Sequence, residues 1–239
     1  MDHSHEPDAI RARLAEGPKV NYLRDWIYGG IDGAITTFAI VAGVVGANLS
    51  VGVILVLGLA NLVADGFSMA ASNYSGTKSE HDDYERIKAI ELRHIRNYPE
   101  GEVEEIRQIY ARKGFEGKEL EAMVKLITAK EDVWLDTMLK EEHSISPIQR
   151  SPMRAAIATF IAFSICGAVP LIPFLLGMNA SAIVASIMTG MVFLAIGAAK
   201  SLWSLQRWWS SALETFFIGM FAAGLAYGIG VGLRALVQV

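Results

Sequence analysis

Three long stretches of this chain contain no charged residue, and they predict helices that cross a membrane. The stretches cover residues 33–64, 155–199 and 215–233. About 20 apolar residues are enough to span a bilayer core, so the first two stretches, with the apolar residues beside them, are too long for one crossing. Each also contains a turn signal. The pattern predicts five transmembrane helices, at residues 22–46, 51–73, 152–176, 180–201 and 212–236.

The charged residues are concentrated in one segment of the chain. Between Lys78 and Glu142 lie 17 of the 25 acidic and 12 of the 21 basic residues. This segment, the first 21 residues and the loop at 200–207 hold nearly all the Lys and Arg, whereas the two tight turns have none. The positive-inside rule therefore places these three regions in the cytoplasm and the carboxyl end outside.

The predicted fold is an all-α membrane protein with five transmembrane helices and a three-helix cytoplasmic domain inserted between the second and the third. Within the inserted domain we expect one helix to continue from the second membrane helix to Pro99, another at 102–113 and a third at 117–142. The predicted parts are a cytoplasmic tail or surface helix at 1–21, two membrane helices at 22–75, the cytoplasmic domain at 76–146 and three membrane helices at 147–239.

Composition excludes several classes of function. Hydrophobic residues make up 52% of the chain and charged residues 19%, below the roughly 25% of an ordinary soluble domain. The single Cys166 excludes a disulfide framework and a Cys-based zinc site. A net charge of −4 leaves no basic surface for nucleic acid. The first 21 residues contain no apolar core of a secretory signal.

Asp32 lies within the first predicted membrane helix. A carboxylate at the centre of a spanning helix costs roughly 2.5 to 3.5 kcal/mol on insertion scales, so it usually marks a functional site. Thr36, one turn later, adds a hydroxyl to the same face, and glycines beside Asp32 allow another helix or a hydrated ion to come close. The alternative is an interfacial carboxylate that reaches out to water.

The second membrane helix carries a polar stripe. Asn61, Asp65, Met69 and Asn73 recur every four residues and therefore share one face. Carboxylate, amide and thioether groups together favour a divalent transition metal over magnesium or calcium. The alternative is that the amide joins helices and the methionine fills space. In the fifth helix, glycines at 224, 228 and 232 predict close packing against another helix.

Candidate metal ligands also occur in the cytoplasmic domain. Glu91 and His94 form a Glu-x-x-His pair of the kind found in carboxylate-bridged iron bundles. Two further pairs at helical spacing contribute the remaining candidates, which are Glu102 with Glu105 and Met138 with Glu142. The alternative for any one glutamate is a solvated helix face, since a domain with 17 acidic residues contains many such pairs.

Four stretches of the chain resemble the vacuolar iron transporter family. They are residues 28–43 (YGGIDGAITTFAIVAG), 58–72 (GLANLVADGFSMAAS), 97–114 (NYPEGEVEEIRQIYARKG) and 136–142 (DTMLKEE). The resemblance implies a homodimer with its ion path between the two copies of the first helix. It also implies proton-coupled export of Fe²⁺ from the cytoplasm.

The family's functional residues map onto positions already singled out. Its first-helix aspartate matches Asp32, and its second-helix methionine matches Met69. In the metal-binding domain, the matching positions are Glu91, Glu102, Glu105, Met138 and Glu142. The chain departs from the family pattern at His94, where a glutamate is expected, and at Leu139, where a second methionine is expected.

The expected function is proton-coupled export of Fe²⁺, or of Mn²⁺ and similar ions, with no organic cofactor. The cytoplasmic carboxylates would capture the ion and pass it to Asn61, Asp65, Met69 and Asp32, where metal binding displaces a proton. The alternative is a membrane-anchored ferroxidase or metal-storage protein, but an iron bundle of that kind needs two Glu-x-x-His pairs. The expected location is a prokaryotic inner membrane, or a vacuolar membrane if the source is eukaryotic.

Overall fold

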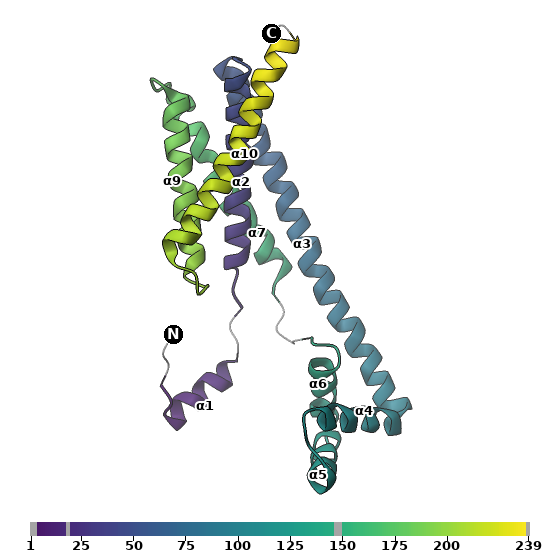
Figure 1. Cartoon of the computed structure of the whole chain (residues 1–239). Helices are drawn as coiled ribbons and strands as arrows, with labels where there is room; N and C mark the ends of the chain where they lie inside the picture. The colour runs from purple at the N-terminus through teal and green to yellow at the C-terminus, as the bar shows by residue number, and fades with distance from the viewer. Residues whose placement is uncertain (1–3, 18–19, 146–149, 238–239) are drawn as a thin grey trace. The chain divides into compact units, whose positions relative to one another are not determined.

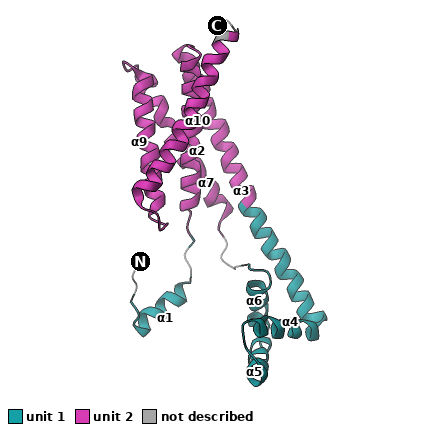
Figure 2. Ribbon diagram, in the orientation of Figure 1, with its two compact units in different colours: residues 1–20, 77–149 teal, residues 21–76, 150–239 magenta. Residues whose placement is uncertain are grey.

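The chain forms two compact units joined by one long helix. The structure, a computed structural model, describes residues 4–17, 20–145 and 150–237, and every element in this described part is helical. The charged unit comprises Met1–Val20 and Thr77–Gln149, and the membrane unit comprises Asn21–Gly76 and Arg150–Val239 (Figure 2). Helix α3, Val51–Asn97, runs through both.

Five helices are long and apolar enough to cross a membrane, as the charge pattern predicts. They are α2 (Leu23–Gly46), α3, the stretch Pro152–Leu175, α9 (Ser181–Ser201) and α10 (Trp208–Val237). The chain is therefore a multi-pass, all-helical membrane protein. The third crossing is not one regular helix. It is α7 (Pro152–Ala168), a 3₁₀ turn η1 (Val169–Leu171) and α8 (Ile172–Leu175), because Pro170 and Pro173 interrupt the helical hydrogen bonds.

The predicted turns end the membrane helices where expected. Asn48, with φ of 58°, reverses the chain between α2 and α3, and Gly177, with φ of 59°, does so before α9. Both residue types tolerate this left-handed conformation.

Helix α2 lies among α7, α9 and α10 in the membrane unit (Figure 1). Helices α2 and α7 approach each other closely. A Cβ atom at Gly29 would lie 2.3 Å from the carbonyl oxygen of Thr159, and one at Gly33 would lie 2.3 Å from that of Phe163. The glycines beside Asp32 therefore admit another helix, which was one of the two predicted uses.

The glycine stripe of α10 does not pack as predicted. A Cβ atom at Gly224, Gly228 or Gly232 would meet no heavy atom within 4 Å. Two other glycines of α10 do pack: a Cβ at Gly230 would lie 2.1 Å from the carbonyl oxygen of Gly43 in α2, and one at Gly219 would lie 2.2 Å from the Phe193 ring in α9. Glycines four residues apart lie on the same face of a helix, but this spacing does not show whether that face contacts another helix.

The charged unit contains the end of α3 and four more helices, α1 (Pro7–Glu16), α4 (Pro99–Arg112), α5 (Gly117–Thr128) and α6 (Glu131–Glu141). The helix predicted at 117–142 is therefore two helices, because Lys130 adopts an extended conformation between them. The break lets α5 and α6 fold together and bury Leu120, Val124 and Trp134. Helix α1 has no buried side chain.

Candidate metal sites

Two polar clusters contain most of the predicted site residues, one in each unit. In the membrane unit, the Thr36 hydroxyl donates a hydrogen bond to the backbone carbonyl of Asp32 (2.9 Å) and accepts one from the Asn61 amide (3.2 Å). The same amide also donates to Thr37 (3.2 Å). Asn61 therefore joins α3 to α2, as the alternative interpretation of this residue proposed.

Asp65 lies in an open groove along α2 and α3. The groove has a volume of about 620 Å³ and polar lining groups from Asn61, Asp65 and Ser68. The half-buried Asp32 lies close enough to Asp65 for the two carboxylates to repel each other. Met69 is partly buried one turn further along α3. Asp65 therefore lines the groove, and Asp32 approaches Asp65 from the neighbouring apolar helix.

A buried charge network lies at the end of this bundle that the sequence did not reveal. Asp25 is 2% exposed and forms an ion pair with Arg150. Asn73 donates to the Asp25 carboxylate (2.8 Å) and to the Thr159 hydroxyl (2.7 Å). Asn73 thus binds α3 to α2 and α7. Its partners are distant in the chain, so no local pattern could have identified them.

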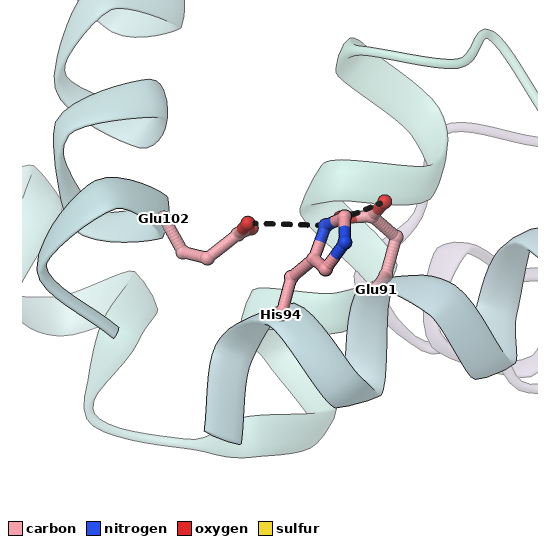
Figure 3. Close-up of side chains that lie close together, drawn as sticks. All are labelled: Glu91, His94 and Glu102. Atoms are coloured by element: carbon pink, nitrogen blue, oxygen red, sulfur yellow. Dashed lines mark ion pairs between the residues drawn. The ribbon is translucent and has the colours of Figure 1, made fainter. Parts of the chain in front are cut away.

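The second cluster is in the charged unit, where α3 meets α4. Glu91 and Glu102 are 3% and 5% exposed. His94 lies between them, with its Nδ1 atom 4.0 Å from Glu91 Oε1 and 3.5 Å from Glu102 Oε1 (Figure 3). Three potential metal ligands therefore converge from two helices, as the Glu-x-x-His spacing predicted in part.

The carboxyl end of α6 adds two more groups to this cluster. The Nε2 atom of His143 lies 3.1 Å from Glu91 Oε1 and 3.5 Å from Glu142 Oε2. Glu105 and Glu142 line a hollow of about 220 Å³ beside them. His143 is not among the predicted ligands, although it directly follows the candidate Glu142.

Met138 has a different environment. It is fully buried in the apolar core of the charged unit, together with Ile95, Ile106 and Trp134. Its packing accounts for an apolar side chain at this position, and its role as a ligand stays a prediction.

The clustering changes the acidity of two glutamates. Burial is the largest of the causes that raise the pKa of Glu102 to about 7; the neighbouring carboxylates of Glu105, Glu91 and Glu142 contribute to this rise, and His143 opposes it. Burial also raises the pKa of Glu142. The cluster thus contains more negative charge than its own cations neutralise, which is the condition in which a carboxylate site binds a divalent cation.

Replacing Glu102 with glutamine is expected to stabilise the metal-free protein at high pH. Folding raises the pKa of this group from 4.5 to about 7, so the folded state gains stability from the bound proton below pH 4.5 and loses it as the pH rises through 7. Glutamine carries no such charge. Above pH 7, E102Q should be more stable than the wild type by about 2 kcal/mol, allowing for solvent screening.

The measurement is thermal unfolding in detergent with a chelator present, at pH 5.5 and pH 8. The matched control is E104Q, because Glu104 lies on the same helix but is exposed, and hydrogen bonds from Gln108 and Arg107 lower its pKa. E104Q should show no gain at pH 8. An equal loss of stability between the two pH values in the wild type and E102Q would contradict the assignment.

Known proteins are similar to this chain over most of its length. Residues 23–231 match the family model described as the VIT family. "Vacuolar iron transporter 1" of Eucalyptus grandis is 35% identical over 216 residues, which cover 89% of this chain and 87% of that protein. The protein of the same name in Arabidopsis thaliana is 35% identical and covers 86% and 83%. "Vacuolar iron transporter" of Toxoplasma gondii is 32% identical and covers 91% and 76%.

Proposed function

The chain belongs to the VIT family, and we propose from this premise that it exports Fe²⁺ from the cytoplasm in exchange for protons. The relatives described above are named as transporters, and this chain is accordingly a transporter and not an enzyme. The two units have different roles in this transport. The charged unit captures the ion, and the membrane unit conducts it.

The observation that carries the proposal is the pair of carboxylates in the membrane unit. Asp32 on α2 and Asp65 on α3 interact unfavourably, and Asp65 faces an open groove. A single ionised carboxylate within a membrane is already costly, and two that repel each other are more so. A divalent cation between them removes both penalties. Asn61 and Met69 supply further ligands along the same helix.

Proton exchange follows from the same groups. A carboxylate must lose its proton before it coordinates a metal, so ion entry releases protons and proton entry releases the ion. Protons arriving from the outside would therefore drive release on that side and reset the path. Asp32 and Asp65 are the groups we assign to this exchange.

Capture is assigned to the charged unit. We propose that α4, α5 and α6, with the end of α3, form a cytoplasmic domain inserted between the second and third crossings. Its ligands are Glu91, His94, Glu102, Glu105, Met138 and Glu142. The abundance of Lys and Arg in this segment and in the 200–207 loop supports the cytoplasmic assignment.

We also propose that the active form is a homodimer. The membrane part of α3 exposes large apolar side chains, such as Val63 and Phe67 at 68% each. The groove beside Asp65 is open along one side. A second copy placed there would enclose the groove and bring two α2 helices together around the ion path. The names of the relatives favour a vacuolar membrane over a prokaryotic inner membrane as the location.

The test is flux into proteoliposomes with an imposed pH gradient. Anaerobic Fe²⁺ uptake should rise when the interior of the liposomes is made acidic, and protons should leave the interior as metal enters. Uptake that does not respond to the gradient would contradict proton exchange. Parallel Mn²⁺ measurements decide whether the chain accepts both ions.

A change at Met69 is expected to alter the selectivity of transport. A thioether is a soft ligand that favours Fe²⁺ over Mn²⁺, whereas Asp32 and Asp65 accept both. M69L nearly preserves the volume of the side chain, so its packing cost should be below about 1.5 kcal/mol. The ratio of Fe²⁺ to Mn²⁺ initial rates should therefore fall at matched free metal. If the ratio keeps its wild-type value while both rates stay high, Met69 only packs against a neighbouring helix.

A further inference from the structure

Glu91 occupies the centre of the cluster in the charged unit. Its side chain is buried, and one of its oxygens, Oε1, lies near a histidine from each of two directions. His94 Nδ1 is 4.0 Å away on the same helix, and His143 Nε2 is 3.1 Å away at the end of α6. Two imidazoles therefore share one buried carboxylate oxygen.

The surrounding carboxylates form two ligand sets with Glu91 in common. Glu91, His94 and Glu102 make the first set, and Glu91, Glu142 and His143 make the second. In each set the possible ligand atoms all lie within 4.8 Å of one another. Ligands about 2.1 Å from a shared metal ion lie at most about 4.2 Å apart, so each set needs only small side-chain movements to close on an ion.

An unpartnered buried atom independently points to a cation here. Glu102 Oε2 is buried and has no hydrogen-bond partner within the described residues, although its carboxylate faces His94. Buried polar atoms are nearly always paired in native proteins. A metal ion in the first ligand set would satisfy this oxygen, which no donor of the described chain does.

We propose that His143 is a metal ligand and that Glu91 bridges two divalent ions. One ion is held by His94 and Glu102, and the other by Glu142 and His143. Carboxylate bridges of this kind hold metal pairs about 3.5 to 4 Å apart in other proteins. The inference rests on the metal-capturing role assigned above to the charged unit and adds a ligand and a number of ions to it.

Two histidines also affect which ion the site prefers. Imidazole nitrogen binds Fe²⁺ and Co²⁺ more strongly than Mn²⁺, whereas an all-carboxylate site discriminates less. With one imidazole for each ion, both positions should favour Fe²⁺. Replacing both histidines with glutamate should therefore reduce the preference for Co²⁺ over Mn²⁺ by at least tenfold.

The competing explanation is that His143 is not a ligand and only neutralises the charge of the buried Glu91. Replacing His143 with lysine distinguishes these two explanations. H143K keeps a cation beside Glu91 but cannot act as a ligand while protonated. H143Q removes both properties. H81Q is the matched control, because His81 lies on α3 ten residues before Glu91, about 15 Å along the helix.

The experiment is a Co²⁺ titration of the full-length protein in detergent, read by calorimetry. H143Q and H143K should each bind one Co²⁺ fewer than the wild type, and H81Q should bind the same number. In the wild type, two sets of paramagnetically shifted imidazole N–H signals are expected in the proton NMR spectrum, and H143Q should lose one. The wild-type spectrum tests for two imidazole ligands without depending on the folding of any variant.

Three results would overturn the inference. If H143K binds as many ions as the wild type, His143 is a charge partner and not a ligand. If E102Q loses Co²⁺ binding but H143Q does not, the charged unit captures metal without His143, and only this inference fails. If neither variant changes binding while Fe²⁺ flux persists, the capture role fails together with it.

Discussion

The D32A protein is expected to insert in the membrane and fold but to transport no Fe²⁺. Asp32 is half-buried on α2, and its side chain makes no hydrogen bond to the neighbouring helices among the described contacts. Removing it also takes a carboxylate out of a membrane-spanning helix, where a charge is costly. Its loss should therefore not destabilise the fold, and it removes a charge that the ion path needs. We expect the initial rate of uptake in proteoliposomes to fall at least a hundredfold.

Two further variants give this experiment its controls. D32E keeps the carboxylate with a longer reach and should retain part of the rate. E214Q removes a carboxylate that is paired with Lys200 at 3.5 Å near the start of α10, outside the groove, and should transport normally. Normal uptake by a correctly folded D32A protein would exclude Asp32 from the ion path.

The second large effect is structural and concerns the contact between α2 and α7. A Cβ atom at Gly33 would lie 2.3 Å from the carbonyl oxygen of Phe163, which is backbone and cannot rotate away. The reverse contact is also close, since a Cβ at Gly167 would lie 2.8 Å from the carbonyl oxygen of Gly33. We therefore expect G33A to lower the free energy of unfolding by about 3 kcal/mol or more.

Thermal unfolding in detergent and the yield of monodisperse protein measure this effect. The matched control is G228A in α10, where the added methyl group would meet nothing within 4 Å. Alanine is the better helix former by up to about 1 kcal/mol, so G228A should be as stable as the wild type or slightly more stable. If G33A is as stable as G228A, the helices are not held at this separation.

The five crossings were predictable because the bilayer imposes simple requirements. A span must be long, apolar and uncharged, and these properties can be read along one stretch of chain. The end of the helix at Thr128 was not predictable in this way. Residues 117–142 carry no proline or internal glycine after Gly117, and the break at Lys130 depends on how α5 and α6 pack against Ile106.

The candidate sites were predictable only along single helices. Helical spacing placed Glu91 beside His94 and aligned Asn61 with Asp65, because these pairs are set by the backbone of one helix. It could not place His143 against Glu91, 52 residues earlier in the chain. It also could not show that Asp25 pairs with Arg150, 125 residues later. Such contacts depend on the tertiary fold.

The unequal attachment of the membrane helices determines which of them is easiest to displace. Helices α2 and α7 meet backbone to backbone at two glycines, so separating them would open a continuous packed surface. Among the described residues, α3 makes no comparably close backbone approach. It is attached through side chains, by the hydrogen bonds of Asn61 and Asn73 and by apolar contacts such as that of Ile54 with the core. Hydrogen bonds within a membrane average about 0.6 kcal/mol each. The helix that carries Asp65 and Met69 is thus the natural moving part, and the α2–α7 pair the fixed frame, of any cycle that opens the ion path to one side at a time.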